Sequence, residues 1–352
     1  MSRTNRTGNS TIVYEDLDLS TIPHTTLPNG EERLKRIAFL AEVRNRALAP
    51  LDRDGVKYDK VLFLNDVIFD PVEATQLLFA TNIDSNNKAN YAAACAVDFI
   101  NAFKFYDRFA TRGYEGDLTG IPFFPWFTTA KNAISRTDVL SQTDAVRVRS
   151  CWGGMVAYDA RWFQQQATPE RTTTSDERNK SVDIRTSPLR FRYDKETFWE
   201  ASECCLINAD LQYRETGKAF PSEPRIFINP YIRVAYDERT LWWLSLTRRP
   251  ERLYSLIHDI LNKAVGFPDP TNRLGEEPGS TITDRWWQYD NPTRGLAANA
   301  TNADFSGHWV NVDRVAEPGG WCGGSNLLVI NEKPEHGEGK WSKIWPPHPP
   351  AQ

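Results

Sequence analysis

The chain has 352 residues, of which 40% are hydrophobic, enough to bury one large core or two modest ones. Its formal net charge of −4 argues against a nucleic-acid partner, because affinity for a phosphate backbone needs surplus lysine and arginine. No stretch approaches the roughly 20 apolar residues of a membrane helix, and residues 1–11 lack the apolar segment of a signal peptide. We expect no membrane segment in this chain, and a cytoplasmic protein if this N-terminus is complete.

Cysteine usage gives no sign of a metal site or of a disulfide framework. The five cysteines are Cys95, Cys151, Cys204, Cys205 and Cys322. Their number is odd and none forms a CxxC pair, which argues against zinc. Adjacent cysteines would form a strained pair, so Cys204 and Cys205 are predicted to be buried small hydrophobes.

Tryptophan and sequon usage bear on carbohydrate and compartment. The 12 tryptophans exceed ordinary usage, and their faces can hold sugar rings, although a tryptophan that fills the core is commoner. N-x-S/T sequons begin at Asn5, Asn9, Asn179 and Asn299. They permit a secretory location, but sequons this short also arise by chance.

The first half of the chain predicts alternating helices and strands. A polar segment, residues 1–30, ends in a turn and is followed by a helix over 31–49 with helically spaced apolar residues. The run 61–64 predicts a fully buried strand that stops at Asn65-Asp66. Asp70, Pro71 and Glu73 then form an N-cap, a first-turn proline and a capping-box glutamate, opening a helix to about residue 80. A second apolar run, 91–99, contains Asp98 near its end, and this order predicts a βαβ unit.

The second half is more irregular. Strands are predicted over 146–149, 154–158, 226–228 and 327–330, an exposed loop over 176–187, and irregular chain over 266–305. The predicted fold class is α/β, with a substantial C-terminal extension. The predicted division is a polar segment 1–30, a catalytic domain 31–245, and an extension 246–352 packed on it.

The sharpest local feature is Asn65-Asp66 at the end of a predicted strand. In open α/β sheets, ligands bind outside the carboxyl ends of the strands. A carboxylate there can hold a hard divalent cation, which in turn binds diphosphate oxygens. The alternative is that Asp66 only caps a turn.

Three other stretches carry residues that could bind a ligand or take part in chemistry. Arg44 can pair bidentately with phosphate, unless it lies on a solvated helix face. Glu203, beside apolar residues, is either a functional buried carboxylate or half of a structural ion pair. Trp152 with Gly153 and Gly154 can bring backbone and an aromatic wall close to a ligand, or can simply form a tight turn.

These stretches, in this order, resemble the cryptococcal capsular α-1,3-mannosyltransferases, the capsule-associated protein family of fungal glycosyltransferases, also called glycosyltransferase family 69. The likeness covers most of residues 30–345. It is carried by LAEVRNRALAPL (40–51), KVLFLNDVIFDP (60–71), YAAACAVDF (91–99), SCWGGMVAYDA (150–160), SECCLINADL (202–211), NPYIRVAYD (229–237) and WCGGSNLLVI (321–330). A more distant likeness is to the yeast Golgi mannan polymerases.

The resemblance implies a GT-A-type glycosyltransferase fold, with a Rossmann-like, mostly parallel central sheet flanked by helices. It implies GDP-mannose as donor, a mannoside or polysaccharide acceptor and Mn²⁺ or Mg²⁺, usually in the Golgi lumen. Arg44 and Asn45 would then lie near the diphosphate, and Asn65-Asp66 would take the place of a DxD motif. The strict DxD motif is absent, and we expect the given sequence to lack the N-terminal anchor and the first strand that are usual in the family.

The resemblance also implies roles at the reacting centre. Trp152, Gly153 and Gly154 would lie beside the sugar, with Glu203 facing the reacting carbon. Asp237 would join Asp66 on the metal. The expected enzyme is a retaining α-mannosyltransferase of cell-wall or capsule synthesis. One competing hypothesis is a non-catalytic carbohydrate-binding protein of polysaccharide synthesis or export, built on a decayed transferase fold. A glycoside hydrolase is a third, with no partner for Glu203 identifiable by spacing.

Overall fold

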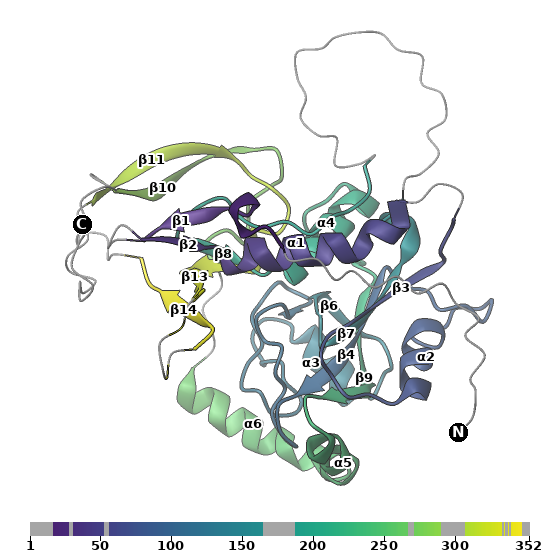
Figure 1. The fold of residues 1–352 in the computed structure, drawn as a ribbon. Coiled ribbons are helices and arrows are strands. Elements are labelled where there is room, and N and C mark those ends of the chain that lie inside the picture. Colours follow the sequence, from purple (N-terminus) through teal and green to yellow (C-terminus); the bar gives the residue numbers. More distant parts are fainter. Residues whose placement is uncertain are drawn as a thin grey trace.

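A six-stranded mixed sheet forms the centre of the computed structural model (Figure 1). The structure describes residues 17–27, 31–52, 56–164, 187–266, 271–289, 307–332, 334, 337 and 339–346. The order across the sheet is β3-β7-β4-β9-β6-β5. In that order the strands span Lys60–Leu64, Met155–Asp159, Ala93–Phe99, Ile226–Ala235, Val146–Ser150 and Arg112–Gly113.

Strand direction corrects one part of the expected fold. Only β4 and β9 pair in parallel, and the other neighbouring pairs are antiparallel, so the mostly parallel sheet is wrong. The predicted β3–helix–β4 unit is present, and its two strands run the same way. However, β7 inserts antiparallel between them. The α/β class itself is confirmed.

Helices cover both faces of the sheet. Along β4, alternate side chains enter two separate cores, because successive residues of a strand point to opposite faces. Cys95 and Val97 face the core that includes residues of α1 (Arg36–Leu48) and α4 (Glu203–Thr216). Ala94 and Ala96 face the core closed by α2 (Pro71–Phe79). The sheet is therefore the middle layer of the molecule (Figure 1).

The remaining helices are shorter or peripheral. They are α3 (Ile134–Leu140), α5 (Glu238–Thr247) and α6 (Glu251–Val265), with 3₁₀ turns η1 (Leu19–Thr21), η2 (Ala49–Asp52), η3 (Ala160–Trp162) and η5 (Gly320–Cys322). In Figure 1, α5 and α6 lie below the sheet, away from α1 and α4.

Local predictions fare differently. The helix predicted over 31–49 begins later, because residues 32–34 form strand β2. The Asp70 cap is confirmed, its Oδ1 accepting from the Val72 N–H at 2.7 Å. The capping box is not formed, since the Glu73 carboxylate instead accepts from the Arg233 N–H at 3.2 Å. Strand β3 is an edge strand, so it is half-buried and not fully buried.

Within the described residues, four two-stranded antiparallel sheets lie outside the central sheet, gathered on one side of it (Figure 1). They pair β1 (His24–Thr26) with β2 (Glu32–Leu34), β8 (Trp199–Ala201) with β12 (Gly323–Ser325), β10 (Thr281–Tyr289) with β11 (Gly307–Val315), and β13 (Leu327–Ile330) with β14 (Trp341–Ile344). Strand β10 occupies part of the region predicted to be irregular, which corrects that prediction. The strand predicted over 327–330 is confirmed. Most of the predicted loop, 176–186, lies outside the described residues.

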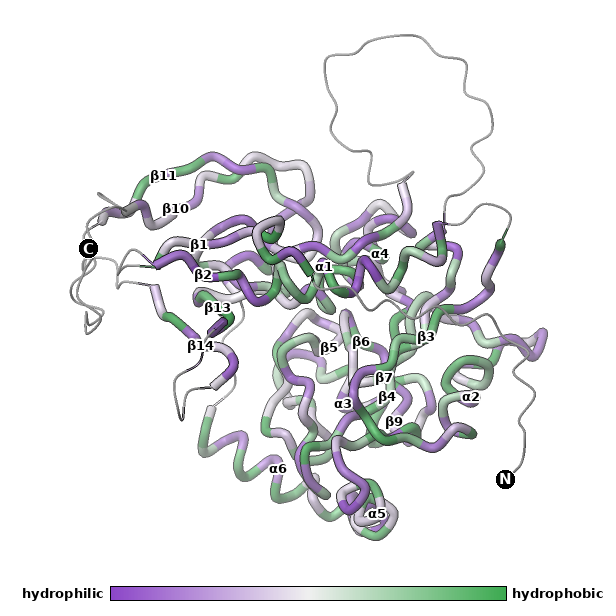
Figure 2. The backbone as a smooth tube through the Cα atoms, in the orientation of Figure 1, coloured by the Kyte–Doolittle hydropathy of each residue, from purple (hydrophilic) through white to green (hydrophobic). Residues whose placement is uncertain are grey.

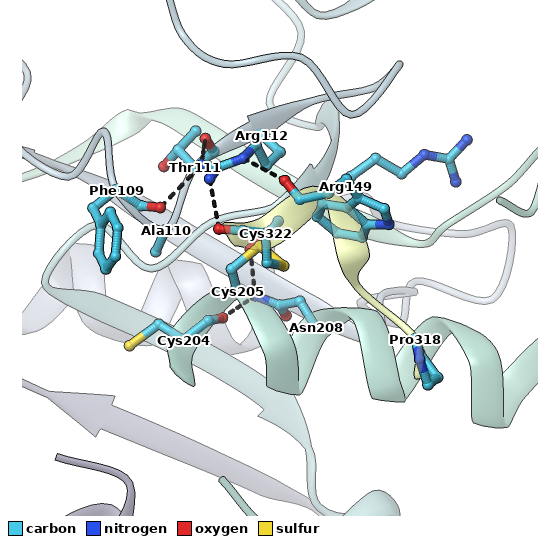
Figure 3. Close-up of a disulfide and its surroundings, with 12 residues drawn as sticks. Phe109, Ala110, Thr111, Arg112, Arg149, Cys204, Cys205, Asn208, Pro318 and Cys322 are labelled. Atoms are coloured by element: carbon cyan, nitrogen blue, oxygen red, sulfur yellow. Dashed lines mark hydrogen bonds between the residues drawn. A yellow bond between two sulfur atoms is a disulfide. The ribbon is translucent and has the colours of Figure 1, made fainter. Parts of the chain in front are cut away.

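Two disulfides overturn the prediction that no disulfide framework exists. Cys95 bonds to Cys151, joining β4 to the segment before β7. Cys205 bonds to Cys322 and ties the C-terminal segment to α4 (Figure 3). The adjacent Cys204 is the free, buried cysteine, and its side chain leaves the helix in another direction (Figure 3). Spacing gave no sign of these bonds because both partners are brought together only by the folded sheet and helix.

Candidate active-site cleft

A cleft of about 420 Å³ lies where α1 and α4 meet one edge of the central sheet. It is lined by residues from elements far apart in the sequence. Among them are Arg36, Leu40, Arg44, Asn65, Asp98, Tyr106, Asp107, Trp152, Glu203, Cys204, Tyr236 and Trp341.

Strand direction explains why these residues meet. Strands β3, β4 and β9 run the same way, so their carboxyl ends lie at one edge. Asn65 follows β3, Asp98 is the penultimate residue of β4, and Tyr236 follows β9. All three line the cleft. The sequence-based expectation of a site at the end of β3 therefore coincides with a cavity.

Arg44 and Glu203 form an ion pair inside the cleft. Glu203 is the first residue of α4 and its side chain is 3% exposed, whereas that of Arg44 on α1 is 16% exposed. The guanidinium also stacks over Trp152, 4.7 Å from the ring centre. Two charges in a largely dry position are retained only when they are paired. A partly exposed guanidinium that is held by a ring and a carboxylate is suited to an incoming anion.

Trp152 lines the cleft but is too buried to offer an open ring face to a sugar. Its ring is largely buried and packs against Phe63, with ring centroids 5.5 Å apart. Its indole N–H donates to the Asn65 Oδ1 at 3.2 Å. This bond sets the orientation of the Asn65 amide, one residue before Asp66.

A hydrogen-bonded set of acidic groups forms the cleft floor. The Asp98 carboxylate accepts from the Tyr236 hydroxyl at 2.8 Å and from the Asp107 N–H at 3.0 Å. Burial, with the neighbouring Asp107 carboxylate, raises the pKa of Asp98 to about 7. Burial likewise raises the pKa of Asp107. Three carboxyl groups, those of Asp98, Asp107 and Glu203, thus line one cleft.

Asp107 also fixes the glycine pair. Its carboxylate accepts from the Gly153 N–H at 3.1 Å. Gly153 and Gly154 have φ of +58° and +66°, a region that disfavours side chains. A Cβ on Gly153 would lie 2.0 Å from the Ala96 carbonyl oxygen. The pair is required for the chain to turn tightly from Cys151 into β7, and neither glycine lines the cleft in the structure.

Asn45 turns away from the cleft. Its side chain makes two hydrogen bonds with the backbone of Phe191, at 2.8 and 2.9 Å. These bonds fasten α1 to the 187–198 segment. The predicted role near a diphosphate remains a prediction, and the structure gives Asn45 a scaffolding contact.

Asp66 and Asp237 lie on neighbouring segments outside the residues that line the cleft. An antiparallel bridge joins Ile68 to Ala235, two residues from each aspartate. Asp66 is exposed and makes no hydrogen bond within the described part of the chain. Asp237 caps α5, its two oxygens accepting from the N–H and the hydroxyl of Thr240 at 2.8 and 2.7 Å.

These residues fit a divalent cation only in part. Over the described ranges, no group of three or more histidine, cysteine or acidic residues could hold a metal ion. Magnesium, however, commonly uses one or two carboxylates and completes its shell with substrate phosphates and water. The open Asp66 carboxylate fits that role. Asp237 would have to release Thr240 to join it.

Asp98, Asp107 and Tyr236 are among the cleft residues that sequence reasoning did not name as site residues. Asp98 carried a signal, because a carboxylate within a strand whose residues are all buried needs partners. Asp107 and Tyr236 carried none, since both follow strands in segments without periodicity. Tyr236 is adjacent to the predicted Asp237, and it is Tyr236 that reaches the cleft floor.

A second cavity, of about 370 Å³, is lined by Glu196, Arg273 and Asp284. Arg273 pairs with both carboxylates and lies 3.9 Å from the Trp199 ring centre. Its charged groups therefore satisfy one another. The first cavity, with a stacked arginine and three carboxyl groups at a sheet edge, is the stronger candidate for chemistry.

None of the described helices is long and apolar enough to cross a membrane.

Comparison with known proteins places the chain in a family. No curated protein and no solved structure matches the chain. Residues 2–210, more than half of the 352, match the family described as cryptococcal mannosyltransferase 1. The chain belongs to this mannosyltransferase family.

Proposed function

We propose that the chain transfers mannose from GDP-mannose to a mannoside or polysaccharide acceptor with retention of configuration. The observation that carries the proposal is the Arg44–Glu203 pair, which lies in a cleft at the carboxyl edge of the sheet. Membership of a mannosyltransferase family is the evidence that the transferred sugar is mannose. The GDP-mannose donor and the retention of configuration are proposed in addition to it.

Each proposed role follows from the position of a charged group. The Arg44 guanidinium binds the donor diphosphate and stabilises negative charge as GDP leaves. Glu203 faces the sugar, where its carboxylate stabilises the positive charge that develops at C1. The acceptor oxygen forms its bond to C1 on the face from which GDP departs, as the C1–O bond to GDP breaks, and the hydroxyl proton passes to the departing diphosphate. Asp107 positions the Gly153 backbone, and Trp152 positions Asn65.

We also propose that Asp66 holds Mn²⁺ or Mg²⁺ together with the diphosphate, with Asp237 as the second carboxylate. The cation would supply Lewis-acid screening of the leaving group. The exposure of Asp66 supports this, because a carboxylate facing solvent is open to a metal–nucleotide complex. The overall arrangement proposed is of the GT-A type.

A secretory location, of the Golgi type, is part of the proposal. Disulfides persist in oxidising compartments and are rare in the cytosol. The chain has two, Cys95–Cys151 and Cys205–Cys322. The sequons of the N-terminal segment are consistent with the same lumen.

The test is a screen of nucleotide sugars for GDP or UDP release with mannobiose as acceptor, followed by NMR of the product linkage. We expect turnover of GDP-mannose to an α-linked product, and loss of turnover in EDTA. Turnover of another donor alone would overturn the donor assignment. Full activity in EDTA would overturn the metal assignment.

The competing function is a non-catalytic carbohydrate-binding protein. It is favoured by one observation: the chain has a single open carboxylate at the DxD-like position. Thermal stabilisation by mannan fragments, without stabilisation by GDP and Mn²⁺, would select it over the transferase.

A further inference from the structure

Helix α6 exposes apolar side chains and buries polar ones, the reverse of the usual arrangement. Leu253, Leu256, Ile257 and Ile260 follow the spacing of one helical face, and all four are exposed, Leu256 by 66% and Ile260 by 68%. The opposite face buries polar His258 and Asn262. Figure 2 shows hydrophobic positions along α6 at the periphery of the molecule. A helix in a globular protein normally buries its apolar stripe, so a stripe that none of the described residues covers marks an interaction surface.

The apolar surface continues beyond α6. On α5, Trp242, Trp243 and Leu246 are exposed, Trp242 by 61%. The loop before β5 adds exposed Phe103, whose ring lies 5.9 Å from that of Tyr254 on α6. Thr247 at the end of α5 donates its hydroxyl to the Ala102 carbonyl at 2.9 Å. Two helices and one loop therefore form one surface, named here the α5–α6 face.

Around this face, the acidic side chains of α6 form ion pairs with the protein, whereas the exposed side chains are mostly basic. The acidic residues of α6 are paired with the body of the protein, Glu251 with Arg233 at 2.7 Å and Asp259 with Arg136 at 2.8 Å. The exposed charged residues of the two helices and their connection are cationic, apart from Glu238. They are Arg239, Arg249, Arg252 and Lys263.

We propose that the α5–α6 face docks on an anionic membrane surface. Interfacial helices combine leucine and tryptophan on one side with arginine and lysine at the rim, and they lie in the plane of the bilayer. The 15 residues of α6 are too few to span it. A second copy of the chain is disfavoured as occupant, because it would bring the same cationic rims together.

Docking has a geometric consequence for the cleft. Helix α5 begins two residues after Tyr236, which lines the cleft floor. Tyr106, also in the cleft, stacks on Tyr236 with ring centroids 5.0 Å apart. A bilayer on the α5–α6 face would therefore lie close to the cleft. The docking inference does not depend on the donor, on catalysis or on the proposed compartment, since it concerns only the attraction of this face to anionic lipid.

The test is flotation of the full chain with phosphatidylcholine vesicles, with and without 30% phosphatidylserine (about one anionic lipid in three). We expect binding to the anionic vesicles, reduced more than about tenfold by the double change Leu256→Ser and Ile260→Ser. Arg249→Gln with Lys263→Gln should reduce it by about thirtyfold and weaken its salt dependence, with Arg239 and Arg252 still in place. Val72→Ser with Phe79→Ser, which changes exposed apolar residues of α2, is the matched control and should bind like wild type.

Three outcomes would overturn the proposal. They are no binding of wild type to either vesicle, equal binding by the Leu256/Ile260 variant, and equal loss in the α2 control. Light scattering distinguishes the other occupant: a dimer that the Leu256/Ile260 variant abolishes would assign the face to a second copy. Circular dichroism and melting temperature establish that each variant is folded.

Discussion

Two kinds of carboxylate lie in the cleft and beside it, and they differ in how the protein holds them. Asp98, Asp107 and Glu203 are buried or half-buried and accept hydrogen bonds from protein groups. Asp66 and Asp237 are exposed. The Asp66 carboxylate has no hydrogen-bond partner among the described residues, whereas that of Asp237 caps α5. Buried, oriented charges suit a reacting centre because they need no reorganisation, whereas an exposed carboxylate suits a ligand that arrives from water.

Breaking the disulfide beside Glu203 should have the largest effect of the changes considered, a loss of folding stability in the part of the protein that holds the buried carboxylates. Cys205 and Cys322 are 117 residues apart, and closing a loop of that length stabilises a fold by about 5 kcal/mol. Arg112, the first residue of β5 and five residues after Asp107, donates to the Cys322 carbonyl (Figure 3). We expect Cys322→Ser to lower the free energy of unfolding by about that amount in a urea titration. Cys204→Ala, which keeps both disulfides, is the control; an equal loss there would contradict the assignment.

Replacing Glu203 should test its proposed electrostatic role. Loss of one oriented group at a reacting centre lowers kcat by about 10²–10³. We expect Glu203→Gln to lose that much GDP-mannose turnover while KM for the donor changes little. Glu42→Gln, in the exposed Glu42–Arg46 pair of α1, supplies the control and should keep wild-type kcat. A wild-type kcat in Glu203→Gln would remove Glu203 from the reacting centre.

The raised pKa of Asp98 predicts a pH dependence of stability. Its pKa rises from 3.8 to about 7 on folding, so between those values the folded state binds more protons than the unfolded state. This contribution is therefore fully present below pH 4 and is lost as pH rises toward 7, by at most ~1.4 kcal/mol per pH unit. Subtracting the pH profile of Asp98→Asn from that of wild type isolates it. A difference that rises with pH would contradict the assignment.

The exposed carboxylates should show smaller and separable effects. We expect Asp66→Asn to weaken Mn²⁺ activation by about tenfold without changing the melting temperature, since its carboxylate supports no contact. Asp66→Asn with unaltered Mn²⁺ activation would exclude it as a ligand. The measurement is a Mn²⁺ titration of turnover beside a thermal melt.

Asp237 should affect stability as a helix cap. Removing a capping carboxylate costs about 1 kcal/mol, so Asp237→Ala should be destabilised by that amount. Asp70→Ala, which removes the cap of α2, is the matched control and should lose a similar amount. An additional loss of Mn²⁺ activation confined to Asp237→Ala would support its second role, and stability equal to wild type would contradict the cap.

Local sequence signals predicted the parts of the fold that depend on neighbouring residues. The Asp70-Pro71 start of α2, the strand before Asn65 and the helix carrying Arg44 are each encoded within a few residues. The place of β7 between β3 and β4 was not predictable, because strand pairing is decided by long-range contacts. The two disulfides escaped for the same reason, their partners being 56 and 117 residues apart.

The candidate site also contains residues that local sequence signals predicted and residues that only the fold brings into place. Arg44 and Glu203 carried signals of residue type and context, and the structure brings them together. Asp107 lies in a loop without periodicity, and only the fold places it against Gly153. Asn45 was expected near the diphosphate only through the family resemblance, and its side chain bonds to the Phe191 backbone instead.

The most direct test of the cleft as donor site is calorimetric titration of GDP-mannose, with Mn²⁺, into wild type and two arginine variants of α1. Arg44→Gln should bind at least about tenfold more weakly than wild type, because a charge-assisted contact to the diphosphate is lost. Arg46→Gln, two residues away in an exposed pair, should bind as wild type does. Equal affinity in Arg44→Gln and wild type would contradict the account.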